Sequence, residues 1–450
     1  MDKNKSIKKS KYDDNTIVYW GGITIYFFMI FFRDVLGYNI PHIALLIYSS
    51  ILFCIFNVKQ CIAFSIAFSI LGTGIQIVYA ILIGTIIIIF KYRGKLRVSK
   101  LFLIFIFLMF WEFAHLFIQP VSIAEYIRYF VMYGYVSMII YNKNIKINNK
   151  LVIYTFIYTT FFVCIDVLLQ SLRLTGYSIS EFIDLGMRLG YAQQVIGSSN
   201  ILMLSSDPNL LGQNCIISIS CLMLLVSKGY NKKLNYLLII TFVGFGLLTL
   251  SKTFILSLVL IGVYVIFYNL IKNRKNISKG LFNLISLILI MIIIIILINT
   301  LFKDSIDHIL TRFTEGDLTT GRVDAFEKYN NYFMENINVF LFGIGLQEIS
   351  IKTQVIGSPH TAIQEIIVYW GIIGIILVFF MILFLILNSK RKSLNKPDLI
   401  NYLPISIFMM IIQTTQLFRF KDRILILILL FVTIQLTQRE KNDYTYKIHI

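Results

Sequence analysis

Long apolar runs recur along the chain from Ile17 to Leu436, and they constrain the fold more than any other feature. Each run is about 17 to 25 residues long, enough to cross about 30 Å of hydrocarbon as an α-helix whose backbone groups pair within the segment. Hydrophobic residues make up 57% of the chain and charged residues 14%, and the mean hydropathy is +0.78. Too little polar surface exists to cover a water-soluble globule, so the sequence predicts an all-α, polytopic membrane protein.

We expect about 12 to 14 transmembrane helices in a single membrane domain, residues 17–437. No small-residue cleavage site separates the Lys-rich leader, residues 1–16, from the first run, so this run is expected to be a retained helix. Residues 438–450 form a terminal tail. The predicted spans are 17–32, 40–57, 60–72, 74–90, 101–118, 122–141, 151–170, 208–227, 234–250, 252–271, 281–302, 362–387, 400–417 and 424–437.

The distribution of charge predicts the orientation of these spans. With both termini cytoplasmic, the inner segments hold 28 of the 41 Lys and Arg residues but only 6 of the 23 Asp and Glu residues. This asymmetry follows the positive-inside rule, so the net charge of +18 indicates orientation and not nucleic-acid binding. Two long loops, 171–206 and 303–359, then fall outside. The second contains a helical-looking piece, Val323 to Asn336, which we expect to form a small cap over the membrane surface.

One group of charges departs from this rule. Arg419, Lys421 and Arg423 lie outside in the predicted topology. Either the last two spans are a re-entrant pair, which we favour, or these cations act at the outer surface.

Neither a metal site nor a cofactor is expected. The five cysteines are an odd number and lie in or beside apolar segments, so they form neither a disulfide framework nor a metal cluster. The outer loops contain no Asp-x-Asp pair of the kind that holds a divalent cation.

The second outer loop contains candidates for catalysis. Arg322 begins the predicted short helix, where its guanidinium can bind a phosphate beside backbone N–H groups; alternatively it is a solvated side chain paired with a nearby carboxylate. His360 follows Ser358-Pro359 at the outer mouth of a long apolar helix, where its imidazole either accepts a hydroxyl proton or only caps the helix. Glu365 lies just below the interface and either orients His360, pairs with a cation or snorkels to water.

The first outer loop and the next hairpin supply candidates for binding an anion. Arg188 lies in the loop, and the turn Asp207-Pro208-Asn209 should cap the following helix, whose N-terminus favours anions. Most such turns are only caps. Lys252 lies at an outer hairpin between two spans, where both a phosphate-binding role and a snorkelling anchor remain open.

Further polar residues lie in or near the spans. Glu112 with His115, and Glu125 with Arg128, have i,i+3 spacing, which puts each pair on one helix face. These pairs and Asp166 are candidates for structural contacts between helices. The outer-end pair is the better functional candidate, with Arg128 as a further substrate-binding cation.

Together these segments resemble the O-antigen ligase and O-antigen polymerase family of bacterial membrane glycosyltransferases. The resemblance covers about residues 188–387, and its specificity lies in the order and topology of short motifs more than in any one string. The motifs are Arg188-Leu189-Gly190 through Gly197 to Asp207-Pro208-Asn209-Leu210-Leu211-Gly212; Leu250-Ser251-Lys252-Thr253; and Gly321-Arg322, Phe326, Gly343-Ile344-Gly345 and His360 followed by Gly371-Ile372-Ile373-Gly374.

The resemblance implies a GT-C-like fold in a bacterial plasma membrane and transfer of a polyprenyl-pyrophosphate-linked glycan at the outer face. A polymerase for a capsule, exopolysaccharide or O-antigen would use Arg322, Lys252 and Arg188 to stabilise the departing pyrophosphate, and His360 as general base. Three positions depart from the family pattern. Lys252 stands where Arg is usual, Phe326 where Trp is common, and Thr361 where Asn often follows the His; the Lys lacks a bidentate fork.

Other functions remain open. A ligase that moves a finished glycan to another acceptor would carry the same motifs. A flippase for lipid-linked oligosaccharide should instead show an internal repeat and charges along a central cavity. A non-enzymatic scaffold predicts that Arg322 and His360 are replaceable. The expected partners are the lipid-linked oligosaccharide, membrane lipid, a chain-length regulator and a flippase.

Overall fold

In the computed structural model, the described residues are 3–71, 75–92, 102–118, 123–142, 145–190, 207–272, 285, 322–345, 361–389, 403–407 and 424–438. Within these ranges all regular secondary structure is helical, and no strand occurs. The predicted all-α class is therefore confirmed for this part of the chain. The span expected at 281–302 and the candidate base His360 lie outside the described residues.

Helices occur close to the bounds expected for the spans. They are α1 (Lys3–Asp34), α2 (His42–Ile55), α3 (Val58–Ser65) with α4 (Phe68–Leu71), α5 (Ile75–Lys91), α6 (Phe102–Ile118), α7 (Ile123–Tyr141), α8 (Asn149–Thr175), α11 (Pro208–Ser227), α12 (Lys232–Leu248), α13 (Lys252–Lys272), α19 (Ala362–Ser389) and α21 (Ile426–Gln438). The loops predicted to lie outside contain α9 (Ile179–Asp184), α16 (Arg322–Glu335) and α17 (Ile337–Phe342). The expected helix at 323–336 is present as α16.

Four helices are long and apolar enough to cross a membrane, by length and composition. They are Thr16–Asp34, Asn149–Thr175, Pro208–Ser227 and Ala362–Met381, and shorter apolar helices accompany them among the described residues. The protein is thus a helical membrane protein with four clear candidate spans, and the larger number of spans remains a prediction from the sequence.

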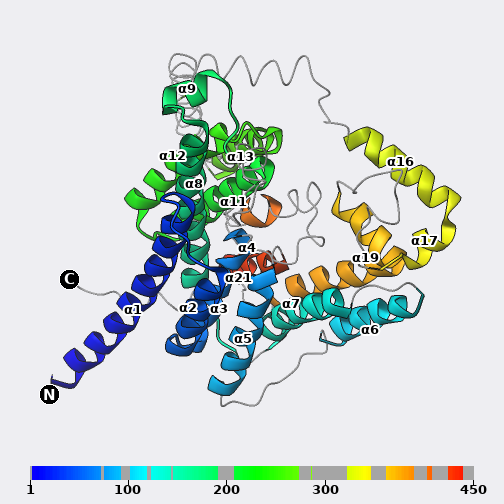
Figure 1. The fold of residues 1–450 in the computed structure, drawn as a ribbon, viewed down its shortest axis with the longest axis horizontal. Coiled ribbons are helices and arrows are strands. Elements are labelled where there is room, and N and C mark those ends of the chain that lie inside the picture. The colour runs from blue at the N-terminus through cyan, green and yellow to red at the C-terminus, as the bar shows by residue number, and fades with distance from the viewer. Residues whose placement is uncertain are drawn as a thin grey trace.

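The helices form two groups in space (Figure 1). α1 to α5, α8 and α11 to α13 make the larger group, and α6, α16, α17 and α19 lie together on the right of the view, with α7 between the two groups in contact with α5 and α6. α21 packs against α7, α8 and α19 and so joins the two groups. The candidate site residues of the first outer loop and of the second outer loop therefore belong to different groups.

Contacts between helix ends agree with the predicted alternation of spans. The guanidinium of Arg173, near the end of α8, donates to the backbone carbonyl of Val35 at 2.7 Å, just beyond the end of α1. Lys91, the last residue of α5, donates to the carbonyls of Phe53 and Cys54 near the end of α2 at 2.8 and 2.6 Å. In each contact, the charge pattern places the two joined helix ends on the same side of the membrane. Which side is the exterior and which is the cytoplasm remains a prediction.

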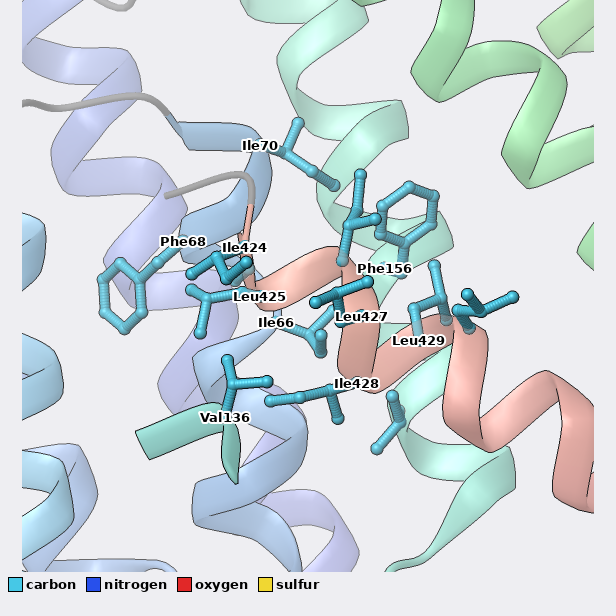
Figure 2. Close-up of a cluster of buried hydrophobic side chains, with 14 of the residues drawn as sticks. Ile66, Phe68, Ile70, Val136, Phe156, Ile424, Leu425, Leu427, Ile428 and Leu429 are labelled. Atoms are coloured by element: carbon cyan, nitrogen blue, oxygen red, sulfur yellow. The ribbon is translucent and has the colours of Figure 1, made fainter. Parts of the chain in front are cut away.

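α21 lies at the centre of the packing. Its segment, residues 424–434, is at most 9% exposed, and Figure 2 shows it among Ile66, Phe68, Val136 and Phe156 of the α3–α4 segment, α7 and α8. A helix that is apolar on every side is covered either by lipid or by neighbouring helices, and here neighbouring helices cover it. Its 13 described residues are about 20 Å long, and the choice between a re-entrant pair and full crossing remains a prediction. Residues 408–423, with the three exceptional cations, lie outside the described residues.

We predict that Leu429→Ala lowers the free energy of unfolding by about 2 kcal/mol or more, because Leu429 is 0% exposed and its truncation leaves a cavity at the centre of the packing. The matched control is Leu103→Ala on α6, where the side chain is 63% exposed. Thermal unfolding of both variants in the same detergent checks this, and equal stabilities would contradict the central position of α21.

Candidate functional site

The segment that leads to Arg188 is anchored on both sides. α9 begins with a capping box, in which Glu181 accepts hydrogen bonds from the backbone and hydroxyl of Ser178, and these bonds lower the pKa of the Glu181 carboxyl. After α9, the backbone N–H of Leu189 donates to the carbonyl of Leu248 at 2.9 Å. The loop is therefore attached to the end of α12 at the residue next to Arg188.

The Arg188 side chain joins three segments that are separate in the sequence. Its Nε donates to the carbonyl of Thr249 at 3.1 Å, and its Nη2 donates to Oδ1 of Asn209 at 3.0 Å. Lys252, the first residue of α13, follows Thr249 by three positions. We call Arg188, Asn209, Thr249 and Lys252 the Arg188 site. The structure thus brings together the loop, the Asp-Pro-Asn turn and the hairpin that the sequence analysis singled out.

Asp207 is the cap of α11, as expected. Its Oδ1 accepts hydrogen bonds from the N–H groups of Asn209 and Leu210 at 2.8 and 3.2 Å, and Pro208 occupies the first helical position. The carboxylate therefore takes the N–H groups by which a helix N-terminus would meet a phosphate. Asp207 and Asn209 act here on the helix and on Arg188, so a ligand at this site would meet the guanidinium.

The hairpin between α12 and α13 is tight and strained. Leu250 has a φ of +47°, a left-handed conformation that costs a residue with a Cβ about 1–2 kcal/mol. Gly212 of α11 fits closely beneath it, because a Cβ there would lie 3.0 Å from the Ser251 side chain. The close packing of this turn on α11 fixes the backbone that carries Lys252.

A second arrangement joins α16 to the start of α19. Gln364 Nε2 donates to the carbonyl of Phe326 at 3.0 Å. Phe326 lies about one turn after Arg322 in α16, and Gln364 is four positions after His360 in the sequence. The contact therefore links the two segments that carry the candidate catalytic residues, although the Arg322 side chain and His360 lie outside the described part of the chain.

Farther along α19, the helix is broken at Gly371, and the segment Gly343–Gly345 fills the break. Gly371 has φ +65° and ψ −162°, a conformation essentially restricted to glycine. An unbroken helix would satisfy the carbonyls of Val368 and Tyr369 with its own amides; instead they accept from Ile344 N at 2.7 Å and Gly345 N at 2.9 Å. We call this arrangement the glycine joint. It attaches the end of α17 to α19 through the backbone.

The two backbones touch at the joint. A Cβ on Gly343 would lie 2.4 Å from the carbonyl oxygen of Tyr369, and a Cβ on Gly371 would lie 2.2 Å from that of Leu341. Since the obstructing atoms are backbone, no rotamer change can relieve these contacts. The sequence motif Gly-Ile-Gly and the later Gly371 are therefore parts of a single structure.

Polar side chains of α6 hold both sides of the joint. His115 Nε2 and Trp111 Nε1 lie 3.0 and 3.2 Å from the carbonyl of Phe342, and Trp370 Nε1 donates to Oε2 of Glu112 at 2.9 Å. The expectation that Glu112 and His115 make structural contacts between helices is confirmed. The sequence analysis gave no role to Trp111 or Trp370; for Trp370, an indole directly before a glycine within an apolar helix was the available signal.

Glu365 and Arg128 occupy the same group of helices. Glu365 is 0% exposed, which excludes a snorkelling side chain, and it lies within electrostatic range of Tyr133 on α7. Arg128 is half-buried, also on α7. Asp166, by contrast, is buried on α8 and accepts a hydrogen bond from Gln170 at 2.6 Å. Glu365 thus belongs to the second arrangement, and Asp166 does not.

Comparison with known proteins gives no assignment. No family model matches the chain, and no match was found among curated proteins or solved structures. Within the described residues, no group of three or more His, Cys, Asp or Glu side chains is placed to hold a metal ion. The resemblance to the O-antigen ligase and polymerase family therefore rests on the sequence motifs.

We predict that Gly371→Ala destabilises the protein by at least about 3 kcal/mol, because the backbone conformation is strained for alanine and the added carbon meets a carbonyl oxygen. Gly244→Ala on α12 is the control, since a Cβ there meets nothing within 4 Å, and it should leave stability unchanged or raise it by up to about 1 kcal/mol. Thermal unfolding in detergent compares them, and a Gly371→Ala protein as stable as the control would refute the joint.

Proposed function

We propose that this chain is a polysaccharide polymerase that joins polyprenyl-pyrophosphate-linked repeat units at the outer face of a bacterial plasma membrane. The observation that carries the proposal is the convergence of Arg188, Asn209 and the Thr249 carbonyl beside Lys252. These hydrogen bonds hold together the segments that carry Arg188 and Lys252, and cationic side chains in such segments of a membrane protein suit a lipid-linked anion.

The proposed reaction begins with a hydroxyl oxygen on the terminal sugar of one lipid-linked repeat unit. It attacks the anomeric carbon of the growing chain, a glycosidic bond forms, and the bond from that carbon to the pyrophosphate oxygen breaks with its electron pair. The hydroxyl proton passes to His360. The polyprenyl pyrophosphate leaves with the added negative charge. Arg322, Arg188 and Lys252 are proposed to stabilise it, which requires the two groups of helices to present these cations to one pyrophosphate; such stabilisation is worth several kcal/mol at a poorly hydrated site.

The second arrangement supplies the catalytic part of the proposal. The hydrogen bond from Gln364 to Phe326 keeps the start of α16 near the start of α19, which supports a shared site for Arg322 and His360. Glu365, buried five positions after His360, is assigned the role of orienting that imidazole. Asp207 and Asn209 are assigned the positioning of Arg188, and Arg128 remains a candidate for contact with substrate.

A ligase would share the donor and the leaving group and differ in the acceptor. Both activities use lipid-linked glycan, so membrane lipid surrounds the substrate in either case, and a flippase and a chain-length regulator are the proteins expected to cooperate. A transporter would not require a base such as His360. These alternatives are separated by the products that remain when the proposed catalytic residues are changed.

We predict that His360→Ala and Arg322→Ala abolish the ladder of long glycans in a deletion strain that carries either variant. Loss of a general base costs about 10²–10⁴-fold in rate, enough to remove visible polymer. The control is Lys328→Ala, which removes an exposed cation from the same helix, α16, and should leave the ladder unchanged. Gels of surface glycan, at equal membrane levels of each protein, give the measurement.

The pattern of products decides between the alternatives. Single repeat units still attached to the surface acceptor support polymerisation. Loss of all attachment, with lipid-linked polymer accumulating, identifies a ligase instead. Ladders like those of the parent in both variants would overturn the catalytic assignment.

A further inference from the structure

We infer that Glu112 and His115 of α6 are positioning residues for the proposed reaction, because they hold the glycine joint and thereby the second outer loop against α19. The inference rests on the proposed function for its consequence in catalysis, and on the contacts of α6 for its structural part. Neither residue belongs to the cations and the base assigned to the chemistry above.

α6 holds the residue before each of two critical glycines. The carbonyl of Phe342, directly before Gly343, lies 3.0 Å from His115 Nε2. The indole of Trp370, directly before Gly371, donates to Glu112 at 2.9 Å. These contacts join residues more than 200 positions apart in the chain. α6 therefore fixes both segments of the glycine joint where their backbones touch.

The ring of His115 lies between two backbone carbonyls. Its Nδ1 lies 2.8 Å from the carbonyl of Trp111, and its Nε2 lies 3.0 Å from the carbonyl of Phe342. Because a carbonyl oxygen only accepts, an imidazole that carries hydrogen on Nε2 donates to Phe342. This bond holds α6 to the residue directly before Gly343.

Glu112 lies on the same helix face as His115. Glu112 and His115 are 1% and 5% exposed, three positions apart, and a Cβ on Gly345 would lie about equally close to both side chains, at 3.2 and 3.0 Å. Buried polar groups are costly unless they are hydrogen-bonded, and Trp370 and Phe342 supply these bonds. The two side chains therefore hold different segments of the joint.

The joint lies where it can act on the proposed site. Residues 322–345 are attached to α19 at two places: Phe326 to Gln364, and Gly343–Gly345 to Val368 and Tyr369. Both places fall within the first ten residues of α19, directly after His360. If the attachment at Gly343–Gly345 loosens, the contact between Phe326 and Gln364 must hold α16 alone. The position of Arg322 relative to His360 is then less defined. A misplacement of about 1 Å in a reacting group costs about 10²-fold in rate.

The tryptophans give a readout that is independent of activity. The chain has three, and two of them, Trp111 and Trp370, make hydrogen bonds in the joint. In a Trp20→Phe background, all tryptophan fluorescence therefore comes from the joint. Glu112→Leu removes the acceptor of the Trp370 indole, Glu112→Gln retains an acceptor oxygen, and Phe110→Ala alters a side chain on α6 that is 67% exposed.

The experiment measures fluorescence and kinetics for these variants in lipid nanodiscs, with a polyprenyl-pyrophosphate-linked repeat unit as substrate. We expect Glu112→Leu and His115→Leu to shift the emission and increase quenching by acrylamide. We also expect them to lower kcat by about 10–100-fold with KM changed less than about threefold, the pattern of a lost positioning contact. Glu112→Gln should recover both signals to near the parent, and Phe110→Ala should match the parent.

The outcomes test separately the clamp on the glycine joint, the positioning role and the proposed function. Unchanged fluorescence in both leucine variants would overturn the clamp, and changed fluorescence with parental kcat would overturn the positioning role. Failure of Glu112→Gln to recover kcat would also contradict it. A parent without polymerase activity would overturn the proposed function and the positioning role, while the fluorescence still tests the clamp. If Glu112→Leu does not fold, Trp370→Phe removes the same hydrogen bond from its donor side and is read by kcat and by the emission of Trp111.

Discussion

The backbone contact between residues 341–343 and residues 369–371 is the constraint on which the outer part of this structure depends. A helix that breaks inside a membrane protein must find partners for the carbonyls it leaves, because hydrocarbon offers none. Here Ile344 and Gly345 supply them, and the approach is so close that neither Gly343 nor Gly371 has room for a Cβ. The second outer loop is consequently attached to α19 by backbone hydrogen bonds at one place and by the Phe326–Gln364 contact at another.

The sequence predicts much of the helix pattern and little of its pairing. The sequence predicts the observed bounds of α11, because Asp-Pro-Asn begins the helix and a turn with Lys residues follows it. The turn before Lys252 is likewise predicted from neighbouring residues alone. The partners of Glu112 and His115 are not predictable, since no local rule connects α6 to residues more than 200 positions away. The Asp-Pro-Asn motif does predict that Asp207 caps its own helix, as observed. It does not predict that Asn209 accepts a hydrogen bond from Arg188.

Two kinds of site-forming contact emerge from the described residues. At the Arg188 site, side chains from a loop, a helix cap and a strained hairpin fix one guanidinium. At the glycine joint, backbone hydrogen bonds and the α6 side chains fix the position of an entire loop. A transferase acting on a lipid-linked glycan needs both, because the leaving pyrophosphate requires positioned cations and the attacking hydroxyl requires a positioned base. The proposed polymerase assigns the first task to Arg188 and Lys252 and the second to the start of α19.

The most direct test of the account uses the purified protein in nanodiscs with a polyprenyl-pyrophosphate-linked repeat unit and no nucleotide sugar. The quantity to measure is the polyprenyl pyrophosphate released for each new glycosidic bond. The account predicts one release per bond, a growing ladder of lipid-linked glycan, and a rate that falls by at least about tenfold when Arg188→Met or Lys252→Met removes one cation. Folded protein that forms no bond and releases no lipid pyrophosphate, or that elongates glycan at the parental rate without these cations, would contradict it.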